Sequence, residues 1–125
     1  MKFLNSLYSI VSKNVTDSSI RYDILLDASH FIYQAHFPEE PITPGVCIIQ
    51  IAKELMENHL HQMLSIKTLK NVKFLNVISP VEIPQVTFEF EKIIIDNHTK
   101  TIKMQSQILS EEVLLAKLSI ICKQK

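Results

Sequence analysis

One short segment gathers residue types that could carry out proton transfer. Residues 36–46 read HFPEEPITPGV, and they include the only glycine of the 125-residue chain. A histidine titrates near neutral pH, so His36 is suited to taking a proton from carbon. Three prolines restrict the backbone that carries it. We therefore expect a site to be built on this segment.

The end of this segment has the features of a helix start. Pro44 suits the first helical position, and Thr43 is a candidate N-cap. The N–H groups of Gly45 and Val46 would then lie in the first turn, where they lack intrahelical acceptors and the helix dipole favours negative charge. A ligand oxygen that gains negative charge could sit against these amides. A side chain at position 45 would obstruct that approach.

The helix that must position these residues is predicted from Pro44 to about Leu64. Its first half is apolar on nearly every side, which is typical of a buried helix. Polar side chains return only in its second half, at Glu57, Asn58, His59, His61 and Gln62.

Strands are predicted on both sides of this helix. The predicted strands are Ser6–Val15 and Ser19–Leu26 before it, and residues 72–78, 86–91, 101–108 and 114–122 after it. Apolar and polar residues alternate along most of them; in the second, Ile20, Tyr22, Ile24 and Leu26 share one face. The expected fold class is α+β, with residues 1–125 as a single domain. An antiparallel sheet of five to six strands would wrap around one long buried helix.

The composition excludes several classes of protein. The chain is 46% hydrophobic and 21% charged, and 13 basic residues balance 13 acidic ones. This charge balance gives no reason to expect binding to nucleic acid or to an anionic membrane. No apolar run is long enough for a membrane span, and the first residues do not read as a signal peptide. Cys47 and Cys122 are expected to be free, buried thiols, and we expect the protein in the cytoplasm.

The residues of the first segment resemble a family signature. His36-Phe37-Pro38, Pro41 and Pro44-Gly45-Val46 stand at the spacing found in the hotdog-fold 3-hydroxyacyl-acyl-carrier-protein dehydratases of the FabZ type. Residues 72–74 and 77–80 (VKF and VISP) resemble that family's third strand and the following turn. The resemblance covers about residues 20 to 120, and the family's longer N-terminal extension is missing.

The resemblance implies a hotdog fold and a function. The implied reaction is dehydration of a 3-hydroxyacyl thioester to a trans-2-enoyl thioester, in fatty-acid or related lipid or polyketide biosynthesis. The substrate would arrive on an acyl carrier protein, and a homodimer would hold the sites at its interface without a metal or other cofactor. His36 would be the base and Gly45 the oxyanion donor. Phe37, Pro44 and Val46 would bind the substrate.

The acid position differs from the family. In the resembling enzymes a carboxylate lies fourteen residues after the histidine and comes from the partner subunit. This chain has Gln50 there, and Glu54 one turn later, where the family usually has glutamine. Residues four apart share a helix face. An amide cannot deliver a proton as a carboxylic acid does.

Two hypotheses follow from this exchange. In the first, Glu54 takes over as the acid, directly or through Gln50 or a water molecule. In the second, the chain binds acyl carrier protein without dehydrating, or forms one half of a mixed dimer whose partner supplies the acid. A hotdog acyl thioesterase is a further alternative, although it needs a carboxylate that activates water.

Some polar residues also have simpler interpretations. Glu54 could pair with a lysine, and Gln50 could be a satisfied buried amide. His30 reads as a surface residue at a strand end. His59 and His61, two apart on a helix, point in different directions, so a shared metal is not expected.

Overall fold

The computed structural model describes residues 2–35 and 39–125, and it follows the expected order of strands, one main helix and more strands. The elements are β1 (Tyr8–Val15), β2 (Ser19–Leu26), α1 (Phe31–Ala35), α2 (Gly45–Leu60), β3 (Leu64–Phe74), β4 (Gln85–Asp96), β5 (Thr101–Ser110) and β6 (Val113–Gln124). The five-residue helix α1 was not predicted.

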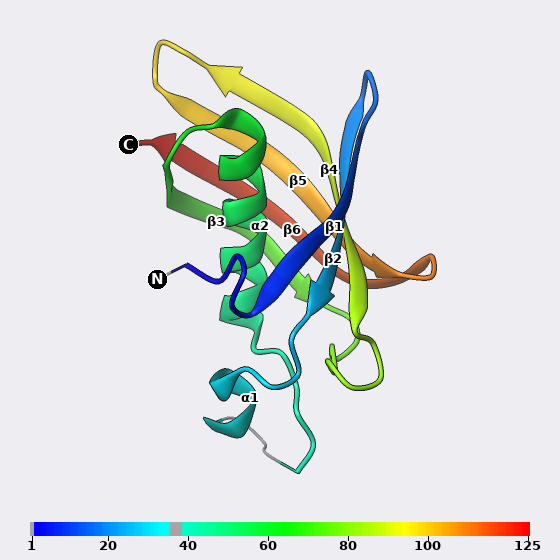
Figure 1. Ribbon diagram of the computed structural model, residues 1–125. Coiled ribbons are helices and arrows are strands. Elements are labelled where there is room, and N and C mark those ends of the chain that lie inside the picture. The colour runs from blue at the N-terminus through cyan, green and yellow to red at the C-terminus, as the bar shows by residue number, and fades with distance from the viewer. Residues whose placement is uncertain (1, 36–38) are drawn as a thin grey trace.

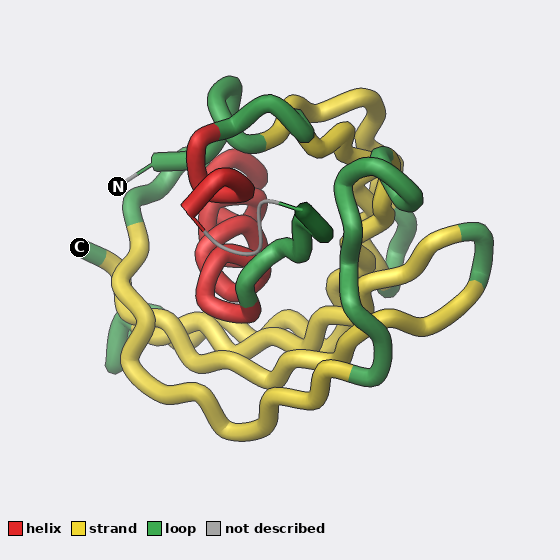
Figure 2. Tube along the Cα trace, turned by 90° about the horizontal axis from the view of Figure 1, so that it is seen from below, coloured by secondary structure: helices red, strands yellow, loops and turns green. Residues whose placement is uncertain are grey.

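All six strands form one antiparallel sheet. Their order is β1-β2-β4-β5-β6-β3, so β1 and β3 are the two edges. The sheet curls, and α2 runs along its concave side (Figures 1 and 2). This is the α+β architecture that the sequence predicts, with six strands.

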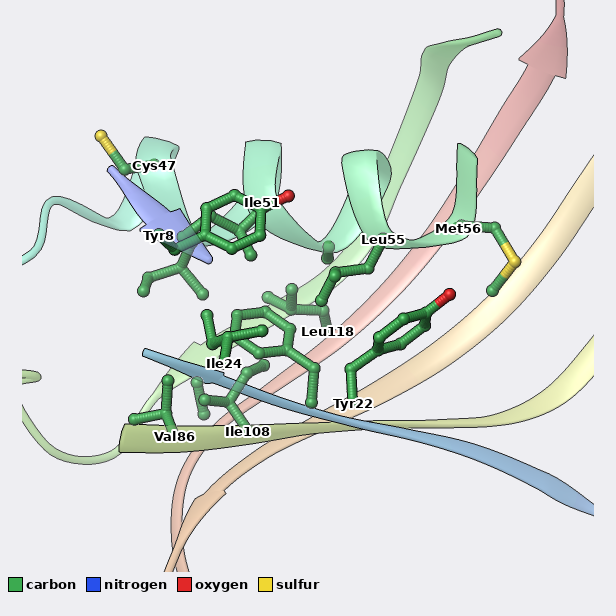
Figure 3. Packing of buried hydrophobic residues seen from close by; sticks show 14 of the residues in the cluster. Tyr8, Tyr22, Ile24, Cys47, Ile51, Leu55, Met56, Val86, Ile108 and Leu118 are labelled. Carbon is green, nitrogen blue, oxygen red and sulfur yellow. The ribbon is translucent and has the colours of Figure 1, made fainter. Parts of the chain in front are cut away.

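The core lies between α2 and the sheet. Alternate residues of β2, namely Ile20, Tyr22, Ile24 and Leu26, are buried, which confirms the face predicted for them. Figure 3 shows Ile51 and Leu55 of α2 directed toward side chains from the strands. Removing this apolar surface from water is the main force that holds the helix on the sheet.

Helix α2 is shorter and less enclosed than predicted. It ends at Leu60 because His61 adopts a left-handed conformation (φ 53°), and the His61 N–H donates to the carbonyl oxygen of Glu57. The helix is buried where it faces the sheet, but Val46 on its first turn is 75% exposed. The expectation of burial on every side is therefore not met.

Strand β3 differs most from its prediction. It spans Leu64–Phe74, whereas the alternation in the sequence indicates a strand at 72–78. Two register irregularities, between Ile66 and Thr68 and between Leu69 and Asn71, interrupt the strand. Each irregularity shifts the side-chain alternation, so a period of two is not visible in the sequence there. Most of this edge strand is also exposed.

Both cysteines are free and buried, as predicted. No helix in residues 2–35 or 39–125 has the length and apolar character needed to cross a membrane.

Candidate functional site

The structure places most of the predicted site residues on one helix. Pro44, Gly45 and Val46 lie at the start of α2, and Gln50 and Glu54 follow along it. His36 and Phe37 lie outside the described residues, so their predicted roles remain predictions.

The helix starts one residue later than predicted. Pro44 is the N-cap, with extended backbone angles (φ −61°, ψ 144°) and no side-chain cap. Its carbonyl oxygen accepts from the N–H groups of Cys47 and Ile48. The N–H groups of Gly45 and Val46 therefore precede the first intrahelical hydrogen bonds, which is the property that makes a helix start attractive to an anion.

Thr43 does not cap the helix, so that prediction is wrong. Its hydroxyl instead shares a hydrogen bond of 2.9 Å with the hydroxyl of Tyr33 in α1, and both residues are buried. The N–H of Thr43 donates to the carbonyl oxygen of Ile78 (2.8 Å). These two bonds fasten the chain just before α2 to α1 and to the segment after β3.

Gly45 has no unusual backbone angle, but it packs closely against the side chain of Phe74. No described glycine has a positive φ. A Cβ at position 45 would lie 2.7 Å from Cε2 and 2.8 Å from Cζ of Phe74. The ring at the end of β3 therefore occupies the place of a side chain at residue 45. This contact is with a side chain of the protein, so the expectation that a side chain at position 45 would obstruct a thioester oxygen stays a prediction.

An apolar cavity of about 330 Å³ opens beside this contact. Its lining combines the start of α2 with the segment that follows β3: Ile42, Thr43, Pro44, Gly45, Ile48, Phe74, Leu75, Asn76, Val77 and Ile78. Val46 is absent from the described lining and is largely exposed. The cavity could accept an acyl or pantetheine chain beside the first turn of α2.

Glu54 is a side chain of α2 whose carboxylate accepts several hydrogen bonds. It is 3% exposed and accepts hydrogen bonds from four groups. Its Oε1 accepts from the backbone N–H of Phe3 (3.0 Å) and of Leu4 (2.8 Å) and from the hydroxyl of Tyr8 (3.1 Å). Its Oε2 accepts from the N–H of Phe3 (2.8 Å) and from Nε2 of Gln50 (2.7 Å). The carboxylate thus fastens the N-terminal turn to α2.

These contacts clarify the alternatives for Glu54. The neighbouring lysine, Lys53, pairs with a different carboxylate: its Nζ lies 3.6 Å from Oε2 of Glu57. Glu54 is instead bonded to neutral donors, and a buried carboxylate needs such partners because burial without them is costly. Burial, reinforced by Glu54, raises the pKa of Tyr8, so its hydroxyl stays a donor at neutral pH.

Gln50 and Glu54 line a different cavity from the one that Gly45 lines. This cavity of about 410 Å³ is lined by Lys2, Leu4, Gln50, Lys53, Glu54, Glu57, Asn58, His61, Gln62, Met63 and Lys125. Among the described residues, the two cavities share no lining residue. Within one subunit, the predicted oxyanion donor Gly45 and the predicted acid residues Gln50 and Glu54 therefore line different cavities.

The remaining histidines contribute no metal centre. His30 follows β2; its Nδ1 accepts from the N–H of Ile32 (3.1 Å), and its ring stacks on Phe31. Across residues 2–35 and 39–125, no three His, Cys, Asp or Glu side chains are grouped as they would be to hold a metal ion.

Comparison with known proteins identifies the family. The model of the ApeI-like family, described as ApeI dehydratase, matches residues 12–113. The chain belongs to the ApeI-like family. No sequence among curated proteins matches it.

Solved structures similar to this member of the ApeI-like family share its fold at low sequence identity. One is the dehydratase heterocomplex ApeI:P from Xenorhabdus doucetiae (TM-score 0.64, 18% identity, 91% of this chain and 96% of that chain). Another is a hypothetical thioesterase with coenzyme A from Streptococcus pneumoniae (TM-score 0.64, 12% identity, 94% and 85%). A third is a sigma28-regulated virulence protein from Campylobacter jejuni (TM-score 0.69, 10% identity, 98% and 87%). These similarities show that the fold is hotdog-like.

The contact between Gly45 and Phe74 predicts a coupled pair. Gly45→Ala should destabilise the wild type by roughly 0.5–1.5 kcal/mol, because the half-exposed ring of Phe74 has to leave its position. In a Phe74→Ala background the same change should be neutral or stabilising, since alanine favours helix over glycine. Urea unfolding of the four proteins measures the coupling energy. Equal effects of Gly45→Ala in both backgrounds would show that the ring does not limit position 45.

The hydrogen bond between residues 50 and 54 predicts a second coupled pair. Glu54→Gln should cost about 2–3 kcal/mol by weakening bonds to a charged acceptor. Gln50→Glu should also destabilise, because two carboxyl groups would meet at hydrogen-bond distance. The exchanged variant, with both changes, restores one amide and one carboxylate. We expect it to be at least about 1 kcal/mol more stable than the sum of the single effects implies. Additive effects in urea unfolding would contradict the bond.

Proposed function

We propose that this chain is a 3-hydroxyacyl-thioester dehydratase subunit of the FabZ-like kind, with a substrate delivered on acyl carrier protein in fatty-acid or related biosynthesis in the cytoplasm. The observation that carries the proposal is the start of α2. There, the N–H groups of Gly45 and Val46 precede the first intrahelical hydrogen bonds, and Gly45 lines an apolar cavity. Membership of the ApeI-like family supports the same reaction class.

The proposed reaction removes water from C2 and C3 of the acyl chain. His36 takes the C2 proton, and the electrons of that C–H bond form the double bond as the C3–O bond breaks. The thioester oxygen gains charge in this step, and the amides at Gly45 and Val46 stabilise it. A proton must reach the departing oxygen so that it leaves as water.

The arrangement of the cavities supports a site that two subunits complete. Edge strand β3 and the segment after it expose Leu69, Phe74, Leu75 and Val77. An exposed apolar edge strand is normally covered by another chain or element. If a second hotdog subunit packed along this edge, Gln50 of one subunit would approach the cavity that Gly45 of the other subunit lines. The similar structure from Xenorhabdus doucetiae is itself a heterocomplex.

The contacts of Glu54 favour a mixed dimer over a self-sufficient homodimer. All four of its partners are donors, so the carboxylate acts here as an acceptor and fold anchor. Gln50 has no acidic proton to give. The acid of the working site would then come from the partner subunit, while this chain contributes the His36 base and the start of α2. A thioesterase is less favoured, since the same contacts leave Glu54 poorly placed to activate water.

Turnover of a 3-hydroxyacyl carrier substrate tests the proposal. The protein alone should dehydrate slowly, and Gln50→Glu should raise the rate by about 100-fold or more, because a positioned general acid contributes at least that much. The introduced carboxyl group would lie beside Glu54. One member of such a pair of carboxyl groups keeps its proton to a higher pH than an isolated carboxyl group does. His36→Ala in the Gln50→Glu background should remove the gain. Enoyl product formation is followed by mass spectrometry.

The control for this series is Glu112→Gln, which alters an exposed carboxylate in the turn between β5 and β6, outside both cavities. It should leave the rate unchanged. Fast dehydration by the wild type alone would refute the mixed-dimer form of the proposal. Release of free acid in place of enoyl product would identify a thioesterase and refute the dehydratase assignment.

A further inference from the structure

Charge is distributed unevenly over the single sheet. The neighbouring strands β3 and β6 contain no aspartate or glutamate and five lysines, which are Lys67, Lys70, Lys73, Lys117 and Lys123. Strands β2 and β4, also neighbours, contain four carboxylates and two basic residues. The equal numbers of acidic and basic residues in the whole chain conceal this separation.

One row of paired residues crosses five strands and shows the separation directly. In the order β2, β4, β5, β6, β3, the register aligns Arg21, Glu89, Gln107, Lys117 and Lys73. At one end of the row, Nη1 of Arg21 lies 3.8 Å from Oε2 of Glu89. At the other end, Lys117 and Lys73 are directly opposite each other, and the residue next to them in the row is an uncharged glutamine.

The opposed lysines lie on the outer face of the sheet. The residues that flank Lys117, which are Ala116 and Leu118, are buried in the core, so Lys117 and its partner Lys73 project from the convex side. Both lysines are exposed, and no ion pair in residues 2–35 or 39–125 includes either of them. Like charges directly opposite each other on neighbouring strands destabilise a sheet. This pair therefore costs stability without a compensating contact inside the described chain.

Protection of the sheet edge accounts for only part of this charge. The register of β3 skips one residue at each of its two irregularities, and the skipped residues are the exposed Lys67 and Lys70. Lysines and bulges on an edge strand hinder unwanted strand pairing. Lys117 and Lys123 have no such role, because β6 lies inside the sheet between β5 and β3. The positive charge on β6 needs another explanation.

We propose that an acidic protein docks on the lysine face, the exposed surface formed by Lys67, Lys70, Lys73, Lys117 and Lys123. Carboxylates of the partner would offset the repulsion between the opposed lysines, and complementary charge would guide the encounter. A second subunit paired along the backbone edge of β3 would leave these outward side chains exposed. The inference goes beyond the proposed function, because it depends on the charges of the sheet and not on the reaction.

The composition and shape of the lysine face favour carboxylates over the phosphates of nucleic acid or of a membrane. The only arginine of the chain, Arg21, is paired with Glu89 on another part of the sheet. Arginine is the residue that proteins favour for recognition of phosphate, because its planar group binds two oxygens at once. The sheet curls around α2, so its outer face is convex and meets a flat membrane over a narrow strip only (Figure 2).

Binding of a fluorescein-labelled decaglutamate peptide tests the proposal. Fluorescence anisotropy is measured at roughly 0.02 M salt, where screening is weak. The double variant Lys73→Gln/Lys117→Gln should bind the peptide about two- to thirtyfold more weakly than the wild type, the range expected for the loss of two exposed ion pairs. The matched control is Lys92→Gln/Lys100→Gln, which removes the same charge from β4 and from the turn after it. It should keep the wild-type affinity.

A single substitution separates docking from folding. Lys73→Glu places a carboxylate opposite Lys117, so the midpoint of urea unfolding should rise while the affinity for the peptide falls. Lys73→Glu/Lys117→Glu again has like charges opposite each other. It should therefore unfold near the wild-type midpoint and bind the peptide more weakly than the double glutamine variant does.

Four results would overturn the proposal. The first is that the peptide binds the wild type no more tightly than the double glutamine variant, and the second is that the control loses as much affinity as that variant. The third is tighter binding of the wild type to duplex DNA or to phosphatidylserine vesicles than to the peptide. The fourth is an unfolding midpoint of Lys73→Glu that stays at or below the wild-type value, because the lysine pair would then cost no stability. None of these results bears on the proposed function, which substrate turnover tests separately.

Discussion

The buried carboxylate of Glu54 is the interaction on which the rest of the candidate site depends. It joins two backbone amides of the N-terminal turn, a hydroxyl from β1 and the amide of Gln50 at one point on α2. Such an anion is tolerated inside the fold only because every contact is a donor. Removing it would release the N-terminal turn from α2 and break the hydrogen bond to Gln50.

A second constraint acts at the other end of the helix. The ring of Phe74 occupies the space beside Gly45, and the Tyr33 and Thr43 hydroxyls fasten the chain that enters α2. Helix start, edge strand and apolar cavity are therefore packed as one unit. The two ends of α2 face different cavities, which is why a second subunit enters the account of function.

Much of this arrangement could be predicted from the sequence, because it depends on periodicity and local chemistry. The bounds of β2 and the burial of its alternate residues follow from the alternation of apolar and polar residues in its sequence. Strand β3 could not be placed, because its irregularities break the alternation. The partners of Glu54 were missed for another reason. Backbone N–H groups some fifty positions away carry no side-chain signature, so no sequence pattern distinguishes them.

A neutron crystal structure of the protein tests the central claim most directly, because it shows the hydrogens of Gln50 and Glu54. The account predicts both amide deuterons of Gln50 on the atom that faces Glu54, and no deuteron on the Glu54 carboxylate. A reversed amide, or a deuteron on Glu54 directed at Gln50, would contradict the account and restore Glu54 as the acid.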